Sequence, residues 1–216
     1  MTDANHSIKP IIIGIAGPSG SGKTLFVDNL KGLLREYHSV VVLREDHYYK
    51  DQSNIPLEER EQVNYDHPNA LEHSLLITHL KELQLRKAIH SPNYLFHTHT
   101  RSRETSLIQP ADIIICDGIL LLADQQVREM LDITAFIDAP LDVCLVRRLK
   151  RDLAERGRSI EKTLDQYTNT VRPMYWEFIA PTKSNVDLVV TGGGKNWEAI
   201  RHFQSLIINE LNSRVS

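Results

Sequence analysis

The residues best suited to chemistry form the segment GPSGSGKT, which matches G-x-x-x-x-G-K-[ST] at every fixed position. Its glycines let successive backbone N–H groups point at an anion, and a helix beginning at Lys23 would direct its dipole there too. In such a loop the lysine contacts the β and γ phosphates of a nucleotide, and the Thr24 hydroxyl ligates magnesium. A Gly/Ser turn that matches by chance is the alternative, which the flanking strand and helix patterns disfavour. We expect the phosphate site to comprise Gly17, Pro18, Ser19, Gly20, Ser21, Gly22, Lys23 and Thr24.

A second reactive segment is REDHYYKDQ, residues 44–52, which directly follows the apolar run SVVVL. Ligands of open parallel sheets bind beyond the carboxyl ends of the strands, so Asp46 would share an edge with the phosphate loop. A carboxylate there could orient an acceptor hydroxyl or take its proton during phosphoryl transfer. The neighbouring tyrosines would form amphipathic walls. The alternative is an exposed turn with incidental tyrosines.

A third acid, Asp117, ends the apolar run in IIICDG, residues 113–118. At a strand end a carboxylate can hold magnesium through water, and Asp117 would do so together with Thr24 and Asp46. It could equally cap the turn before Gly118. Beside a phosphate loop we favour the metal role.

The segment RRLKRDLAERGR, residues 147–158, is basic and predicted to be helical. The residues alone leave two interpretations of its arginines open. Arg148 and Arg151, or Arg151 and Glu155, share a helix face, as in an ordinary solvated helix with intrahelical ion pairs. Arginines on both sides of Gly157 also suit a mobile element that closes on phosphates.

The elements that must position these residues alternate between strand and helix patterns along the 216 residues. Five buried strands are expected within residues 11–17, 39–43, 111–122, 133–140 and 187–192, and helices after Lys23 and within 70–88, 141–157 and 197–213. This pattern predicts an α/β fold with a parallel five-stranded sheet covered on both faces. Residues 51–110 break the rhythm and predict a helix and a β-hairpin inserted at the sheet's edge. We expect one domain, residues 1–216.

Composition excludes several classes of protein. A formal net charge of -3 gives no indication of a nucleic-acid or membrane surface, and no apolar run reaches the length of a membrane span. Cys116 and Cys144 lie in apolar runs, which indicates core thiols and a reducing, cytoplasmic location. The first ten residues contain no apolar stretch of signal-peptide length. His97 and His99 alone do not supply the four ligands of a zinc site.

Six segments resemble, in order and spacing, the uridine kinase (uridine–cytidine kinase) family, most closely its bacterial members. They are GPSGSGKT, EDHYYKDQS, NYDHPNA, CDGILLL, RRLKRDLAERGRS and QYTNTVRPMYWEFIAPTK. The resemblance spans about residues 11–207. The phosphate loop alone is shared by many unrelated proteins, but its combination with Y-D-H-P and E-R-G-R is far more specific. It favours the mobile lid, at about residues 147–166, over the solvated helix.

The resemblance implies a P-loop NTPase-type fold and a magnesium-dependent kinase. Such an enzyme transfers the γ phosphate of ATP or GTP to the 5′-hydroxyl of uridine or cytidine. It also implies a homotetramer whose partners are small nucleosides and nucleotides, without nucleic acid or membrane. The insertion, residues 51–110, would form the nucleoside pocket.

Residue roles follow from the same resemblance. Asp46 matches the general base for the ribose 5′-hydroxyl, with Tyr49 beside it, and Asp66 matches the acid that binds the ribose hydroxyls. Tyr94 and His99 match the pair that recognises the base, and the two histidine tautomers could serve a carbonyl or an amine. Further substrate contacts match Arg148, Arg158 and Gln166. The lid arginines nearest the phosphates match Arg151 and Arg156, which with Lys23 and Asp46 form the catalytic set.

Two departures from the family pattern affect these expectations. The usual EGIL is CDGIL here, so Asp117 has a reach one methylene shorter than glutamate and magnesium coordination could run through an extra water. The usual PRGG is VTGGG, without its arginine, and Lys195 is the residue left to border the adenine.

Two rival functions remain at this point. A kinase for another small hydroxylated metabolite, such as pantothenate or ribulose phosphate, would share the fold but not YDHP with the Tyr94/His99 pair. A catalytically silent nucleotide-binding regulator would not need Lys23, Thr24 and Asp46 intact.

Overall fold

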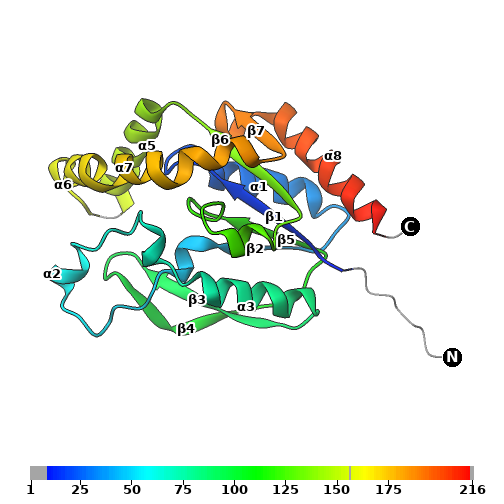
Figure 1. Cartoon of the computed structure of the whole chain (residues 1–216), viewed down its shortest axis with the longest axis horizontal. Coiled ribbons are helices and arrows are strands. Elements are labelled where there is room, and N and C mark those ends of the chain that lie inside the picture. Colours follow the sequence, from blue (N-terminus) through cyan, green and yellow to red (C-terminus); the bar gives the residue numbers. More distant parts are fainter. Residues whose placement is uncertain (1–8, 156, 215–216) are drawn as a thin grey trace.

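The structure, a computed structural model, describes residues 9–155 and 157–214. Its centre is a parallel sheet with the strand order β2-β5-β1-β6-β7 (Figure 1). The five strands are β1 (Ile11–Ala16), β2 (Val40–Arg44), β5 (Ile113–Asp117), β6 (Ile133–Asp138) and β7 (Leu188–Thr191). All five lie within the ranges expected from the sequence or within one residue of them, which confirms the parallel α/β fold.

One face of the sheet is covered by α1 (Lys23–Leu34) and α8 (Trp197–Ser213). Alternate residues of β1 point to this face, and Ile13 packs there with Phe26 of α1 and Phe203 of α8. The two phenylalanine rings lie 6.0 Å apart. Because β1 is buried on both faces, it is apolar at nearly every position rather than alternating.

The opposite face is covered by the insertion, which holds α2 (Leu57–Arg60), α3 (His73–Gln84) and an antiparallel hairpin of β3 (Ile89–Leu95) and β4 (Thr100–Ile108). The hairpin is confirmed, but the insertion covers a face of the sheet and does not lie at its edge as expected. Leu76 and Leu80 of α3 pack on Ile12 and Ile114, in the middle of the sheet. The apolar stripe of α3 needs such a surface, and the lower half of Figure 1 shows α3 and the hairpin together beneath the sheet.

The basic segment forms α5 (Leu141–Glu155), which runs to the edge of the gap at Arg156. After it, α6 (Ile160–Gln166) starts at Ser159, whose Oγ accepts a hydrogen bond from the Lys162 N–H at 3.2 Å. Helical turns continue through α7 (Arg172–Met174), and the short α4 (Gln125–Arg128) follows β5. Within the described part of the chain, every helix is too short or too polar to cross a bilayer.

Candidate active site

The phosphate loop joins β1 to α1, as its sequence predicts. Gly20 and Gly22 adopt left-handed φ values of 84° and 98°. A side chain on Gly20 would put its Cβ 2.4 Å from the Cys144 carbonyl oxygen, so α5 packs directly on the loop. The Lys23 ammonium is buried and donates to the carbonyl oxygens of Gly17 at 3.0 Å and Pro18 at 3.1 Å. Burial lowers the pKa of Lys23, although Asp117 and Glu45 oppose the change.

A glycine segment from the far end of the chain supports this loop. A Cβ on Gly193 would lie 2.8 Å from the Ser21 carbonyl oxygen, and one on Gly194 would lie 2.7 Å from the Gly22 carbonyl oxygen. Asn29 of α1 donates to the Gly194 carbonyl oxygen at 2.8 Å. The glycines of VTGGG are therefore explained by close backbone contact. Lys195 follows them on the surface and does not line the central cavity described next, so its contact with adenine stays a prediction.

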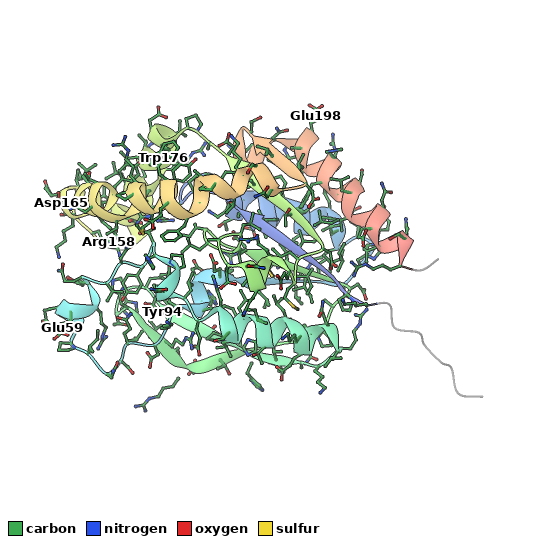
Figure 2. The ribbon with its side chains drawn as sticks, viewed as in Figure 1. Glu59, Tyr94, Arg158, Asp165, Trp176 and Glu198 are labelled. Carbon is green, nitrogen blue, oxygen red and sulfur yellow. The ribbon has the colours of Figure 1, made fainter. Side chains whose placement is uncertain are left out.

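A cavity of about 340 Å³ lies beside the phosphate loop and brings most of the expected residues together. Figure 2 shows Tyr94 and Arg158, which both line it, on its hairpin side and its lid side. Arg156 falls outside the described residues. The expected residues that line the cavity are Ser19, Gly20, Gly22, Lys23, Thr24, Asp46, Tyr49, Asp66, Tyr94, His99, Asp117, Arg148, Arg151, Arg158 and Gln166.

Two acids stand at the carboxyl ends of neighbouring strands. β2 and β5 pair with Arg44 opposite Asp117, and Asp46 follows β2 in a short 3-10 turn, residues 45–48. Asp117 is buried, which raises its pKa; Lys23 opposes that change and Asp46 adds to it. The Thr24 hydroxyl donates to Asp117 Oδ2 at 3.4 Å. Hydroxyl and carboxylate oxygens are the donors that Mg²⁺ prefers, so these residues fit that ion.

The turn after Asp117 is held by another acid. The Leu120 N–H donates to Glu45 Oε2 at 2.9 Å, so the carboxylate bound by this turn is that of Glu45. This arrangement favours the metal role of Asp117 over the capping role. Glu45 was not predicted, because a charged residue at a strand end usually indicates a solvated turn.

The expected base pocket is lined by aromatic rings from three segments. The Tyr94 ring lies 5.2 Å from that of Tyr49, and His99 stacks on Tyr65 at 4.7 Å and 20°. His99 has a positive φ of 53°, which turns the hairpin tip. Burial raises the pKa of Tyr94, so its hydroxyl stays a neutral donor. Tyr65 and Phe96 also line the cavity and were missed, although they neighbour the predicted residues Asp66 and Tyr94.

The lid side carries a group that we name the arginine cluster: Arg148, Arg151, Arg158 and Asp152. Asp152 is fully buried on α5. Its Oδ1 accepts from Arg151 Nη2 at 2.9 Å, and its Oδ2 lies 3.4 Å from Arg158 Nη1 and 3.6 Å from Arg148 Nε. Asp152 thus faces at least these three guanidinium groups, and even with Asp66 beside Arg148 the described arginines outnumber the carboxylates here.

Neighbouring contacts tie this cluster to the substrate residues. Gln166 Oε1 accepts from Arg148 at 3.1 Å and from Arg158 at 2.7 Å, and Arg148 Nη1 lies 3.6 Å from Asp66 Oδ1. Arg151 Nη2 lies 3.5 Å from the Ser19 hydroxyl of the phosphate loop. These six predicted residues from distant segments are therefore joined, through Asp152, in one contact network.

The arginines also show the limits of the helix pattern. Intrahelical pairing of Arg151 with Glu155 was one expectation, but Arg151 pairs with Asp152, and the Glu155 side chain lies outside the described residues. Arg147 was not predicted, yet its Nη1 donates to the carbonyl oxygens of Gly20 and Ser21, both at 3.3 Å.

A phosphate loop between a parallel strand and a helix, facing a cavity lined by carboxylates and a group of arginines, defines a kinase of the P-loop class. The phosphoribulokinase from Rhodobacter spheroides shares this fold with a TM-score of 0.63 and 16% identity, over 86% of this chain and 71% of that one. The D-glycerate 3-kinase from Cryptococcus neoformans does so with a TM-score of 0.62 and 18% identity, over 85% and 86%.

The chain belongs to the phosphoribulokinase/uridine kinase family, whose model matches residues 12–197. It is 50% identical to the uridine kinase of Salmonella paratyphi B over 93% of this chain and 94% of that protein. It is 49% identical to the uridine kinase of Proteus mirabilis, again over 93% of this chain and 94% of that protein. The protein is therefore a kinase that takes its phosphate from a nucleotide.

Proposed function

We propose that the protein is a nucleoside kinase that transfers the γ phosphate of ATP or GTP to the 5′-hydroxyl of uridine and cytidine. The products are UMP and CMP, as in pyrimidine salvage. The observation that carries this proposal is that a single cavity is lined by the phosphate loop on one side and by Asp46, Asp66, Tyr94 and His99 on the other. The bacterial relatives at about 50% identity are named uridine kinases.

The acceptor half of the reaction depends on two acids and two ring side chains. Asp46 would orient the ribose 5′-hydroxyl and take its proton as the phosphoryl group is transferred. Asp66 would accept hydrogen bonds from the other two ribose hydroxyls, because one carboxylate can accept from both. Tyr94 and His99 would bind the base, with Tyr49 beside the ribose, and the two tautomers of His99 would suit uracil and cytosine alike.

The donor half depends on the loop and the lid. Backbone N–H groups of residues 17–24 and the Lys23 ammonium would bind the phosphates, and Arg151 and Arg156 would neutralise charge that develops on transfer. Magnesium, held by Thr24, Asp117 and Asp46, would supply further neutralisation of the phosphate charge. Arg148, Arg158 and Gln166 would keep the lid against the nucleoside and exclude water, which suppresses hydrolysis of the donor.

The test is a coupled assay of ADP release with magnesium and ATP, with each acceptor supplied separately: uridine, cytidine, thymidine, adenosine, pantothenate and ribulose phosphate. Turnover confined to uridine and cytidine is the expected result. Turnover on another acceptor would support the kinase activity and contradict the proposed substrates. Tight nucleotide binding without turnover on any acceptor would favour the silent regulator.

Two further expectations belong to this proposal: a homotetramer, from the family resemblance, and a cytoplasmic location, from the two cysteines in apolar runs. Light scattering of the purified chain should give a mass near four times 24.7 kDa. A monomer would contradict the first expectation without affecting the chemistry.

A further inference from the structure

Three side chains that are not among the predicted site residues connect the loop that carries Asp46 with the loop that carries Asp117. We name it the histidine cluster: Glu45, His73 and Asp124. His73 Nε2 lies 2.9 Å from Glu45 Oε1, and His73 Nδ1 lies 3.0 Å from Asp124 Oδ2. Glu45 and His73 are both almost inaccessible to solvent. The proposed chemistry uses none of the three side chains.

Both nitrogens of the His73 ring face a carboxylate oxygen. A neutral imidazole has a single N–H and could donate to only one of them, whereas an imidazolium donates to both. Burial alone would lower the pKa of His73, but the hydrogen bonds and charges of Glu45 and Asp124 outweigh burial and raise it. The ring is therefore held between two carboxylates that favour its protonated form, and its orientation is determined at both ends.

The second oxygen of Glu45 binds the loop after β5. It accepts the Leu120 N–H at 2.9 Å, and a Cβ added to Gly118 would lie 2.1 Å from it. The Glu45 carboxylate thus packs on the backbone immediately after Asp117, while its own backbone immediately precedes Asp46. One side chain, in addition to the pairing of β2 with β5, therefore bridges the backbone segments that carry Asp46 and Asp117.

Asp124 anchors the other end of the cluster to a different element. Its Oδ1 accepts the N–H groups of Gln126 at 2.8 Å and Val127 at 3.1 Å, the first turn of α4. His73 is the first residue of α3. The cluster therefore connects the end of β2, the loop after β5, the start of α3 and the start of α4.

We propose that Glu45, His73 and Asp124 are positioning residues that hold Asp46 and Asp117 in register for phosphoryl transfer. The proposal rests on the proposed function, in which Asp46 activates the acceptor and both acids face the donor's metal. Outer groups that fix reactive carboxylates matter because a misplacement of about 1 Å can cost roughly 100-fold in rate. Loss of such groups around a metal site typically weakens the ion's binding by about 10–100-fold.

The variants that test this are His73→Gln and Glu45→Gln, with His79→Gln as the matched control. His79 is a second buried histidine on α3, but its Nδ1 bonds the Tyr48 hydroxyl at 3.0 Å inside the core. Loss of kcat by about 10–100-fold is expected in the two test variants, with less than about 3-fold change in the KM for uridine. The control should keep both constants within about 3-fold, since it alters a hydrogen bond to the Tyr48 hydroxyl in the core and leaves the contacts of Glu45 in place.

A readout independent of turnover is the binding of a fluorescent ATP analogue with and without Mg²⁺. The gain in affinity that Mg²⁺ provides should shrink by about 10-fold or more in the test variants and stay unchanged in His79→Gln. The double variant should lose no more kcat than the worse single variant, because the residues act as one unit. If wild type turns over no nucleoside, the proposed function fails while this binding measurement still decides the present proposal.

Two results would overturn it. One is a folded His73→Gln protein with wild-type kcat and wild-type Mg²⁺ dependence. The other is an equal loss in His79→Gln, which would reveal a general effect of disturbing α3. Circular dichroism and thermal unfolding establish folding, and if His73→Gln does not fold, Glu45→Gln and Asp124→Asn decide by the same two measurements.

Discussion

The histidine cluster and the arginine cluster both contribute side chains to one cavity and use charge in opposite ways. In the first, one imidazole ring is held within the scaffold between two carboxylates that favour its protonated form. In the second, one buried carboxylate faces three guanidinium groups that also line the cavity. In the first, the ring and both carboxylates have partners in the scaffold, whereas in the second the described arginines outnumber the nearby carboxylates of Asp152 and Asp66.

The two sides of the cavity therefore have different roles in a kinase of this shape. The side that carries the acids must be rigid before substrates arrive, because their register sets the geometry of transfer. The arginines of the lid side must change partners, because to bind phosphates they have to release the carboxylate that holds them in the free protein. Buried charges that are complete in the free protein favour rigidity, and buried charges in excess favour a response to ligand.

The largest effect is expected from replacing Asp46, the acid that the histidine cluster holds in place. For Asp46→Asn we expect kcat to fall by about 100- to 10,000-fold, the range that general bases contribute, with a small change in the KM for uridine. Steady-state kinetics with the ADP-release assay measure it. Asp28→Asn, an exposed acid on α1, is the control. Normal kcat with a greatly raised KM would assign Asp46 to binding.

The arginine cluster should show its excess charge when its carboxylate is neutralised. Asp152→Asn should lower the free energy of unfolding by about 3–5 kcal/mol, because the arginines around it lose their buried counter-charge. Added MgATP should raise the Tm of this variant more than that of wild type, since phosphates replace the lost anion. Thermal unfolding with and without MgATP tests both. Asp142→Asn, exposed on the same helix, should show neither effect.

The histidine cluster should instead reveal itself through pH. The pKa of His73 is raised in the folded protein, so its contribution to stability is complete below about pH 6.5 and is lost as the pH rises through the folded pKa. Each pH unit by which the pKa is raised corresponds to about 1.4 kcal/mol. Urea unfolding of wild type and His73→Gln across pH 5.5 to 9 measures it, as an order-of-magnitude effect. A difference that grows with pH would contradict a charged His73.

The second buried histidine of α3 provides a comparison of opposite sign. Burial lowers the pKa of His79, so its contribution is present above about pH 6.5 and is lost as the pH falls through the folded pKa. The difference between wild type and His79→Gln should therefore shrink toward acid pH. Parallel pH profiles for the two variants would show that neither ring titrates as described.

The smallest effect is expected from a charge pair that is not buried. Lys162 on α6 lies 3.6 Å from Glu61, with the two side chains 73% and 44% exposed. Lys162→Ala should change the free energy of unfolding by less than about 1 kcal/mol, because solvent screens such pairs. Urea unfolding measures it. A loss as large as that of Asp152→Asn would mean that burial does not distinguish these charges.

Most of the fold could be predicted from local patterns. Runs such as IIIGIA predict buried strands, and the apolar faces of α1 and α8 predict helices packed against them. Both can be predicted because a buried face requires apolar residues at a regular spacing in the sequence. The placement of the insertion was wrong, because the pattern of α3 shows that it has a buried face but not which surface covers it.

The site divides in the same way. The residues of GPSGSGKT carry their function in their own spacing, and the nucleoside residues Asp66, Tyr94 and His99 became candidates through the family resemblance. Glu45, Asp124 and Asp152 could not be found, because a single acid on a turn or a helix usually lies in solvent. What distinguishes these acids is a partner 28 or more positions away or a lack of solvent, and only the folded chain shows either.

The contact of Gly193 and Gly194 with the phosphate loop also sets an order of events during synthesis of the chain. The backbone that packs against the loop leaves the ribosome roughly 170 residues after the loop itself. At bacterial or eukaryotic rates of translation that interval is on the order of 10 to 30 s. For that time the growing chain carries the loop without the backbone that supports it.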